Sequence, residues 1–539
     1  MKKYILVIKS VMLFSCLIYS TTLKAQYSSQ SPQFGTDIKV SHAIAANNMS
    51  SKIKVADNGW IFILDFYVLD SNTKRWEIYC SKDQGLTYKL SFSFGYETAA
   101  YDLQDVDFAV IGHDSASISI FVAEAITQGV LGGAPSRCQV EKFDVSGSLT
   151  KVVYEYDWSG KTVTHVAITD DHRYPSLNSS FPISIGVVWV GGDAAASEDH
   201  LTYAISNDGG ETFTNHFMYN QVWPGRLGKA SISMGANSDT GPGLVGVAFE
   251  KNLIGSVWGD IGVIVNYYDL SGEWTVPVTI GEGDFASINM NPTISLRQAS
   301  AGMPSADHFS LIAGYEHQGA NVISQACYAL MDYTYFYYGC PQAQPTDLTY
   351  HYINAGTSYS TTELNFNYNT HNDQYYLTYL TTDNYQFHFS TIEADPLSAL
   401  MEKATFRDIS SYIGWPTYPC VDSNPITGLA YFSWTDAEDG IGENVYTDSE
   451  ASALGVNERV TSGKHLLLYP SPAMNQVTVE FQGTELFTVA LTDLMGKEVL
   501  SRPSCSNKCK LDVSGLRPGI YQVRVSDRNS SEVQKLIIQ

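Results

Sequence analysis

The chain has 539 residues, of which 16% are charged, and its formal net charge is −24. Residues 1–25 hold four lysines, and residues 466–539 hold eight Lys and Arg against seven Asp and Glu, which leaves −29 for residues 27–465. A body this acidic excludes nucleic acids and anionic membrane surfaces as partners. The 35 tyrosines and 42 glycines, without long amphipathic helical patterns, indicate an ordered β protein.

Residues 1–25 have the organisation of a secretory signal peptide. Lys2 and Lys3 precede an apolar run, and the small residue Ala25 marks cleavage before Gln26. Lys9 interrupts the apolar run, and no later stretch is long and apolar enough to cross a membrane. Cys16 leaves a lipoprotein signal open as an alternative. We expect a secreted protein without a membrane span.

Two turns share the pattern Ser-x-Asp-x-Gly-x-Thr-aromatic, at residues 81–88 and 206–213. Gly supplies left-handed backbone, and the Asp carboxylate can accept hydrogen bonds from turn amides. A strand-like run precedes each turn. The residues expected to have this structural role are Ser81, Asp83, Gly85, Thr87, Ser206, Asp208, Gly210 and Thr212.

This pattern resembles the Asp-box of sialidase-like β-propellers. In that family the box is a structural hairpin on the outer side of a blade, remote from any active site. The resemblance therefore implies a fold and says little about chemistry.

Aspartates recur after strand-like runs with a step of about sixty residues. Asp83, Asp144, Asp208 and Asp269 are separated by 61, 64 and 61 residues, and the same step leads to Asp332, Asp395 and Asp448. Each repeat has room for four strands and their turns, which is one propeller blade. The sequence predicts seven blades, with the six blades usual for sialidases as the alternative. Residues 34–41 form an extra strand that we expect to complete the last blade and close the ring.

The pattern changes after a polar linker at residues 456–465, which separates a propeller at 26–455 from a domain at 466–539. Short period-two runs joined by Asp, Gly and Pro turns predict a small β-sandwich there. Its ordered motifs are carried by Pro470, Pro472, Asp493, Gly496, Gly519, Tyr521 and Lys535.

These motifs resemble the type A sorting domain of type IX secretion substrates, found in the Bacteroidota. The family usually has Asn where Ser471 stands. The resemblance implies export through the periplasm and outer membrane, with the secretion machinery as a partner that reads this domain. It places the protein at the cell surface or outside the cell.

In a four-stranded blade, the loops between second and third strands and the connections between blades open on one face, opposite the Asp-box turns. Aromatic rings with polar edges suit sugars or peptide side chains, although they can equally pack loops together. The binding candidates on this face are Arg173, Tyr174, Trp223, Arg226, Trp258, Asp260, Arg407, Trp415 and Asp436.

Sialidases grip the substrate carboxylate with three arginines and use a Tyr/Glu nucleophile pair. Arg173-Tyr174-Pro175 resembles the family's Arg-Ile-Pro signature, and Arg226 and Arg407 lie in comparable connections. However, Arg173 falls in the third repeat instead of the first, and spacing selects no Tyr/Glu pair, so no catalytic residue is assigned. We expect a non-catalytic binding or adhesion module for glycans or proteins. A sialidase-like glycoside hydrolase and a scaffold for another exported protein remain alternatives.

No cofactor is expected, although the acidic loop from Asp436 to Glu443 leaves calcium open. Two cysteine pairs could form disulfides in an oxidising compartment, Cys505 with Cys509 and Cys327 with Cys340. The strand residues Cys80, Cys138 and Cys420 are expected to be buried as small apolar side chains.

Overall fold

The computed structural model consists of two compact units, Met1–Ala453 and Leu454–Gln539. The structure describes residues 37–41, 47–112, 117–129, 135–158, 161–171, 183–193, 195–222, 224–237, 241–253, 259–267, 274–281, 288–297, 309–319, 324–333, 345, 347–353, 361–381, 386–393, 407–408, 416–425, 427–436, 443–449, 466–469, 473, 475–481, 487–492, 497–505, 508–517, 519–526 and 531–538. Within these ranges the secondary structure is all β, and no helix is long and apolar enough to cross a membrane.

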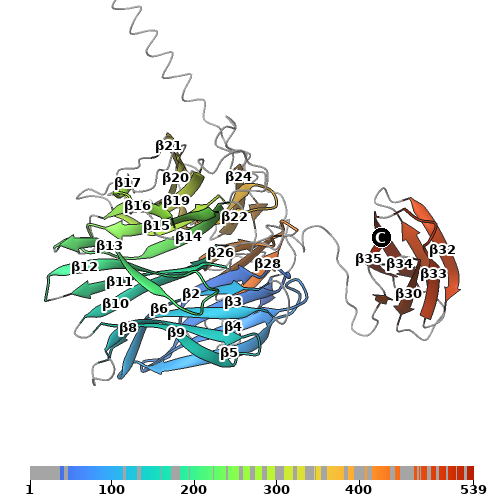
Figure 1. The fold of residues 1–539 in the computed structure, drawn as a ribbon, viewed down its shortest axis with the longest axis horizontal. Helices are drawn as coiled ribbons and strands as arrows, with labels where there is room; N and C mark the ends of the chain where they lie inside the picture. Colours follow the sequence, from blue (N-terminus) through green and yellow to red (C-terminus); the bar gives the residue numbers. More distant parts are fainter. Residues whose placement is uncertain are drawn as a thin grey trace, which may run out of the picture. The chain divides into compact units, whose positions relative to one another are not determined.

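The first unit consists of four-stranded antiparallel sheets that follow one another along the chain (Figure 1). The first three sheets are β2 (Asn47–Val55), β3 (Ile61–Asp70), β4 (Thr73–Ser81) and β5 (Lys89–Glu97); β6 (Tyr101–Ile111), β7 (Ser119–Gln128), β8 (Ser136–Asp144) and β9 (Leu149–Trp158); and β10 (Thr162–Asp170), β11 (Ile185–Asp193), β12 (Glu198–Ser206) and β13 (Thr214–Val222).

The next three sheets are β14 (Ala230–Asn237), β15 (Gly241–Lys251), β16 (Asp260–Tyr267) and β17 (Val278–Gly281); β18 (Ile288–Leu296), β19 (Phe309–Gln318), β20 (Ser324–Tyr333) and β21 (Asp347–Tyr352); and β22 (Thr361–Asn369), β23 (Gln374–Thr381), β24 (Gln386–Glu393) and β25 (Arg407–Asp408). The last sheet is β26 (Thr417–Ser423), β27 (Ala430–Asp436), β28 (Asn444–Ser449) and β1 (Ile38–Lys39).

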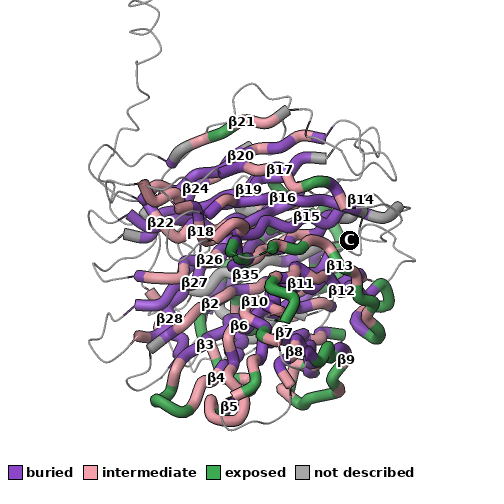
Figure 2. Tube along the Cα trace, turned by 90° about the vertical axis from the view of Figure 1, so that its left-hand side faces the viewer, coloured by how far each residue is buried: buried purple, intermediate pink, exposed green. Residues whose placement is uncertain are grey.

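The first strand of each sheet lies against the first strand of the next. These inner strands are β2, β6, β10, β14, β18, β22 and β26, and β26 in turn contacts β2, so the ring is closed. Figure 2 shows outer strands such as β5 and β9 at the periphery. The predicted all-β propeller class is thereby confirmed. In the described ranges its ring contains seven four-stranded sheets.

The predicted closing strand is present in the last sheet. Ile38 pairs with Thr447 and Lys39 with Tyr446, so a strand from the start of the chain occupies the outer position next to β28. Val40 extends the pairing, because its amide donates to the carbonyl of Val445. The two ends of the ring are therefore joined by backbone hydrogen bonds, which covers a sheet edge that would otherwise stay open.

The hydrophobic core lies between neighbouring sheets. Phe62 and Trp76 of the first sheet pack in one buried cluster with Phe108 and Ile120 of the second. The middle strands are apolar along most of their length because both of their faces are covered; the first seven residues of β3 are all buried. Outer strands such as β5 are largely exposed, since only their inward edge is paired.

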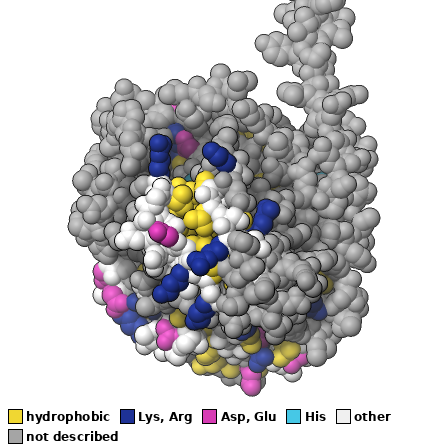
Figure 3. All heavy atoms as spheres, turned by 90° about the vertical axis from the view of Figure 1, so that its right-hand side faces the viewer, with side chains coloured by type: hydrophobic (Ala, Val, Ile, Leu, Met, Phe, Trp, Pro, Cys, Tyr) yellow, Lys and Arg dark blue, Asp and Glu magenta, His cyan; other side chains and the backbone are white. Residues whose placement is uncertain are grey.

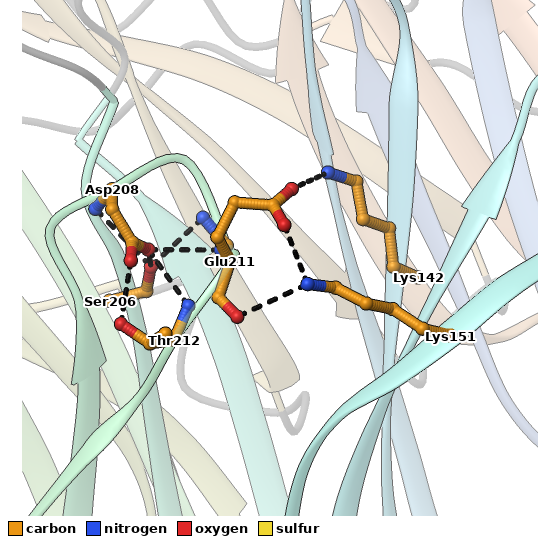
Figure 4. Close-up of polar contacts among 7 residues, drawn as sticks. Lys142, Lys151, Ser206, Asp208, Glu211 and Thr212 are labelled. Carbon is orange, nitrogen blue, oxygen red and sulfur yellow. Dashed lines mark hydrogen bonds and ion pairs between the residues drawn. The ribbon is translucent and has the colours of Figure 1, made fainter.

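The predicted turn residues make the contacts that their types suggest. The Asp208 carboxylate accepts hydrogen bonds from Thr212 N at 2.9 Å, Thr212 Oγ1 at 2.6 Å and Ser206 Oγ at 2.7 Å (Figure 4). Asp83 makes the equivalent contacts with Ser81 and Thr87 in the first sheet. Both turns connect the third and fourth strands of their sheets, so the two aspartates occupy equivalent places.

Glycine is required in these turns for two reasons. Gly210 has φ +83° and Gly85 has φ +90°, which L side chains rarely adopt. In addition, a Cβ atom on Gly210 would lie 2.2 Å from Phe121 of the second sheet. The neighbouring Glu211 binds that sheet directly, because its carboxylate meets Lys142 at 2.7 Å and Lys151 at 2.5 Å (Figure 4). The turn therefore fastens one sheet to the one before it.

Asp144 forms a similar turn after β8, accepting from Ser146 N at 2.8 Å and Ser148 N at 3.0 Å. Asp332 and Asp448 lie in third strands, at the penultimate position of β20 and β28. The predicted counterparts Asp269 and Asp395 lie outside the described residues.

The second unit contains two antiparallel sheets with their own core. One sheet is β29 (Leu466–Tyr469), β30 (Gln476–Phe481) and β33 (Lys508–Asp512), and the other is β32 (Glu498–Cys505), β31 (Phe487–Thr492), β34 (Gly519–Ser526) and β35 (Ser531–Ile538). Val479 and Leu511 of the first sheet pack with Val489 and Val523 of the second.

Cationic side chains are exposed on this second unit. Its described Lys and Arg side chains are Lys497, Arg502, Lys508, Lys510, Arg517 and Arg524. Figure 3 shows a face on which Lys and Arg side chains border apolar ones. The surface chemistry of this unit thus differs from that of the acidic first unit.

Of the predicted disulfide cysteines, Cys327 and Cys509 are free thiols in the structure. Each is buried in an apolar core, Cys327 between two sheets of the ring and Cys509 inside the second unit. Burial foremost raises the pKa of Cys327 to about 12, which makes its thiol unreactive. Cys340 and the side chain of Cys505 lie outside the described residues. Cys80 and Cys138 are buried as predicted, and Cys420 is partly buried.

Replacing Asp208 by Ala should lower the free energy of unfolding by about 1–2 kcal/mol, because the turn loses its charge-assisted hydrogen bonds. Urea denaturation of the full chain measures the change. Glu211→Gln is the matched control, and its effect should stay below about 1 kcal/mol because the ion pairs it weakens are exposed. Equal effects of the two substitutions would contradict a structural role for Asp208.

A buried carboxyl in the first sheet predicts a dependence of stability on pH. Asp65 is fully buried, and burial, followed by the nearby charge of Glu77, raises its pKa to about 8. The folded state then holds a proton that the unfolded state releases above pH ~4, so Asp65 makes stability fall as pH rises toward 8.

Asp65→Asn should remove this fall. Its free energy of unfolding should therefore rise relative to that of the native chain by up to about 1.4 kcal/mol per pH unit between pH 5 and 8. Urea denaturation at each pH tests the expectation. Asp157→Asn on the exposed part of β9 serves as control. Parallel pH profiles for the native chain and Asp65→Asn would refute it.

Candidate functional site

The inner strands surround a central cavity of about 590 Å³, to which every sheet of the ring contributes lining residues. Successive inward side chains on these strands are two residues apart, as in Lys52 and Lys54 on β2 or Asn365 and Asn367 on β22. Many of them are polar and short, so that space remains between them. The cavity is therefore the polar centre of a ring whose cores lie between the sheets.

Inward side chains also close the junctions between sheets. Asp105 and Asp107 on β6 accept hydrogen bonds from the amides of Val166 and Ile168 on β10, at 3.3 and 3.0 Å. Ser233 on β14 accepts from Leu296 N on β18 at 3.0 Å. An inner strand has no backbone partner on its open edge, and these side chains supply the acceptors that it lacks.

Inward side chains accept amide hydrogen bonds from the next sheet in the last sheets of the ring as well. Asn365 on β22 accepts from Val421 N on β26 at 3.2 Å. Asp422 on β26 accepts from Val55 N on β2 at 2.7 Å, which joins the last sheet to the first. The polar lining is thus part of the architecture as well as the surface of the cavity.

One wall of the cavity is charged and internally paired. Lys52 Nζ lies 3.1 Å from Asp107 Oδ1, and His165 Nδ1 lies 3.6 Å from Asp105 Oδ2. Burial alone would lower the pKa of Lys52, but Asp107 and Asp105 outweigh it and the pKa is raised. Burial would raise the pKa of Asp105, but His165 and Lys52 lower it. Lys52 and Asp105 therefore remain ionised as neighbours at neutral pH.

The opposite wall is lined by neutral polar groups. They are hydroxyls and amides from β14, β18 and β22, namely Ser231, Ser233, Thr293, Ser295, Asn365 and Asn367. Hydroxyl and amide groups can donate and accept hydrogen bonds at once. This wall can therefore match a ligand that presents several hydroxyls.

A ring of backbone irregularities surrounds one end of the cavity, which we call the mouth. Six inner strands have a register shift near their first residues. Three of the residues at these shifts, Asn291, Glu363 and Tyr418, have φ of 54°, 53° and 54°. A positive φ is costly for residues other than Gly, and such strain concentrates at functional sites. Because these residues begin their strands, they lie at the end of the cavity opposite the Asp208 turn.

Carboxylates accept hydrogen bonds from backbone amides at these irregular positions. Glu250 accepts from Lys229 N at 2.9 Å and from Asn291 N at 2.7 Å. Glu363 accepts from Tyr418 N, and Glu443 accepts from Asn48 N at 2.8 Å. These acidic groups hold the mouth in its strained conformation.

Glu363 is a mouth carboxyl with a raised pKa. Burial foremost, and then the charge of Glu316, raises its pKa to about 7. The Tyr418 amide and Lys229 lower it, but they do not compensate for the loss of solvent. A carboxyl with this pKa is partly protonated at neutral pH, so it can donate or accept a hydrogen bond.

Of the binding residues predicted for the loop face, Arg226 and Asp260 both contact other groups of the protein. Arg226 Nε binds the buried carboxylate of Asp199 at 2.5 Å, and its backbone pairs with Leu253. Asp260 accepts from the Asn252 side chain at 2.5 Å. Neither Arg226 nor Asp260 lines the cavity. Arg173, Tyr174, Trp223, Trp258, Trp415 and the side chain of Arg407 lie outside the described residues.

Asp436 corrects the prediction of an exposed acidic loop. It is the last residue of β27, pairs in register with Asn444, and is 2% exposed. Its side chain is buried in the sheet, because β27 extends through Asp436, which the sequence pattern placed in the following loop. It is therefore not a surface ligand, and residues 437–442 of that loop lie outside the described residues.

Sequence reasoning missed the residues of the cavity. Lys52, Asp105, Asp107, Asn365 and Asn367 alternate with apolar residues in first strands, and this alternation was the available signal. It shows that one face of each strand meets a polar environment. It does not show that these faces converge on one cavity.

Comparison with known families assigns the C-terminal unit. The model of the secretion system C-terminal sorting domain matches residues 467–539. No curated protein matches the chain.

Three solved structures similar to the chain have low sequence identity to it. An α-L-arabinofuranosidase from Fusarium graminearum is 9% identical with a TM-score of 0.41, covering 77% of this chain and 98% of that one. A protein of unknown function from Dyadobacter fermentans is 11% identical with a TM-score of 0.40 and the same coverage. The NanB sialidase of Streptococcus pneumoniae is 8% identical with a TM-score of 0.40, covering 80% and 73%.

The chain thus combines a closed ring of four-stranded sheets with a C-terminal segment that matches a known family. Residues 467–539 match the secretion system C-terminal sorting domain family, which indicates export of the β-propeller by type IX secretion to the cell surface or extracellular space.

Proposed function

We propose that the exported propeller is a non-catalytic binding protein that takes part of an extracellular glycan or protein into its central cavity. The observation that carries this proposal is the cavity of about 590 Å³, lined by polar groups from every sheet of the ring. Its volume is in the range of small-molecule sites, and its walls are rigid strands. Export to the surface or beyond supplies access to such ligands.

Two carboxylates of the lining, Asp105 and Asp107, have structural roles, and this favours binding over catalysis. Asp105 and Asp107 accept backbone hydrogen bonds from the next sheet and meet His165 and Lys52. Both carboxylates are therefore engaged in contacts that the fold needs, and His165 and Lys52 lower the pKa of Asp105. A glycosidase requires one carboxylic acid and one carboxylate placed on either side of a scissile bond. The charged wall of this cavity is arranged for neither role.

Blocking the cavity should abolish ligand binding. Ser231→Trp places a large ring among the lining residues, and affinity on an array of extracellular glycans and surface proteins should fall at least tenfold. Ser93→Trp on the exposed outer strand β5 is the control and should bind like the native chain. An array that stays blank for the native chain at high concentration would overturn the proposal.

Glycoside hydrolysis is a second candidate, favoured by the pKa of Glu363 at about 7 and by Tyr418 beside it at the mouth. A protonated Glu363 could act as general acid, so turnover would decline as pH rises through 7. Chromogenic glycosides test this at pH 5 to 9. If Glu363 is the acid, Glu363→Gln should lower kcat at least a hundredfold and remove the decline above pH 7, whereas turnover unchanged in this variant would exclude the role.

A further inference from the structure

We infer that the central cavity selects an electrically neutral, hydroxyl-rich ligand, such as a neutral sugar unit, and rejects acidic sugars. This inference rests on the proposed binding function and specifies its ligand class. It follows from how the charges of the cavity are already used, from what its neutral wall offers, and from the cost of burying a ligand charge.

The described cations of the lining are already matched by groups of the protein. Lys52 lies 3.1 Å from Asp107. Burial would lower the pKa of Lys54, but Asp422 and Asp107 raise it, which places Lys54 in the field of both carboxylates. Lys229 Nζ donates to the neutral amide oxygen of Asn291 at 2.9 Å, and its charge acts on Glu363, where it opposes the rise in pKa. A ligand carboxylate would have to compete with these partners for each ammonium group.

Negative charge is distributed around the same space. Asp105 and Asp107 lie on one side and Glu363 lies at the mouth. Like charges at close range repel, and an anion moved from water to such a site loses hydration and meets cations that already have partners in the protein. Uptake of an acidic sugar would therefore cost free energy that a neutral sugar does not require.

The neutral wall supplies the complementary recognition. Ser233 Oγ accepts from Leu296 N, which leaves its hydroxyl proton to donate. Asn365 Oδ1 accepts from Val421 N, which leaves its amino group to donate. The hydroxyl of Ser231 lies on the same strand as that of Ser233. Donors held in place by the backbone of the neighbouring sheet suit hydroxyl oxygens of a sugar, because they are oriented before the ligand binds.

The decisive experiment compares two neutral sugars with their uronic acids and adds N-acetylneuraminate as a further acidic sugar. Isothermal titration calorimetry of the full chain is carried out with galactose and galacturonate, with glucose and glucuronate, and with N-acetylneuraminate. Neutral members should bind at least tenfold more tightly than their acidic partners. Equal or tighter binding of the acids would overturn the inference and leave the binding function standing. Failure of both classes to bind would overturn the proposed function as well.

A cation introduced into the cavity provides a second, independent test of the inference. Ser231→Arg introduces a guanidinium into the neutral wall, and it should raise the affinity for galacturonate at least tenfold over the native chain. Ser93→Arg on the exposed outer strand is the matched control and should change nothing. Where circular dichroism shows that Ser231→Arg is unfolded, Ser231→Lys takes its place. A folded cationic variant that gains no affinity for the acid, with the native chain binding both sugars alike, would contradict the inference.

Discussion

The open edges of the inner strands are the constraint on which this structure depends. Each inner strand is paired on one side only, and its amides on the other side face the centre of the ring. Side chains of the preceding sheet accept those hydrogens, as Asp107 does for Ile168 and Asn365 for Val421. Asp422 makes the same contact with Val55 across the join between the last and first sheets. Buried backbone donors without acceptors would be costly, so the centre must be polar.

This constraint determines the chemistry of the cavity. A buried carboxylate that is ionised needs a partner charge, and Lys52 supplies one to Asp107, which accepts a backbone hydrogen bond from the next sheet. At the mouth, Glu250 and Glu363 stabilise backbone that has been forced into positive φ at Asn291 and Tyr418. A cavity built in this way has many oriented hydrogen-bonding groups and little charge to offer a ligand. Selective binding of a neutral ligand is the consequence.

The C-terminal unit is independent of these requirements. Its two sheets pack around their own core, in which Val479 and Val523 are fully buried. Its exposed lysines and arginines contrast with the acidity of the propeller. A segment that folds on its own core can carry a sorting function without depending on the chemistry of the cavity.

Local patterns in the sequence determined the all-β class, the strand from the N-terminal region that closes the last sheet, and the sorting domain. Turn chemistry around Asp83 and Asp208 is short-range, because its donors and acceptors lie within four residues. The cavity, in contrast, joins residues hundreds of positions apart, such as Lys52 and Tyr418. Only the packing of neighbouring sheets decided that Lys52 would meet Asp107 and that Glu363 would be desolvated. Those properties depend on neighbours from other sheets, which no local pattern specifies.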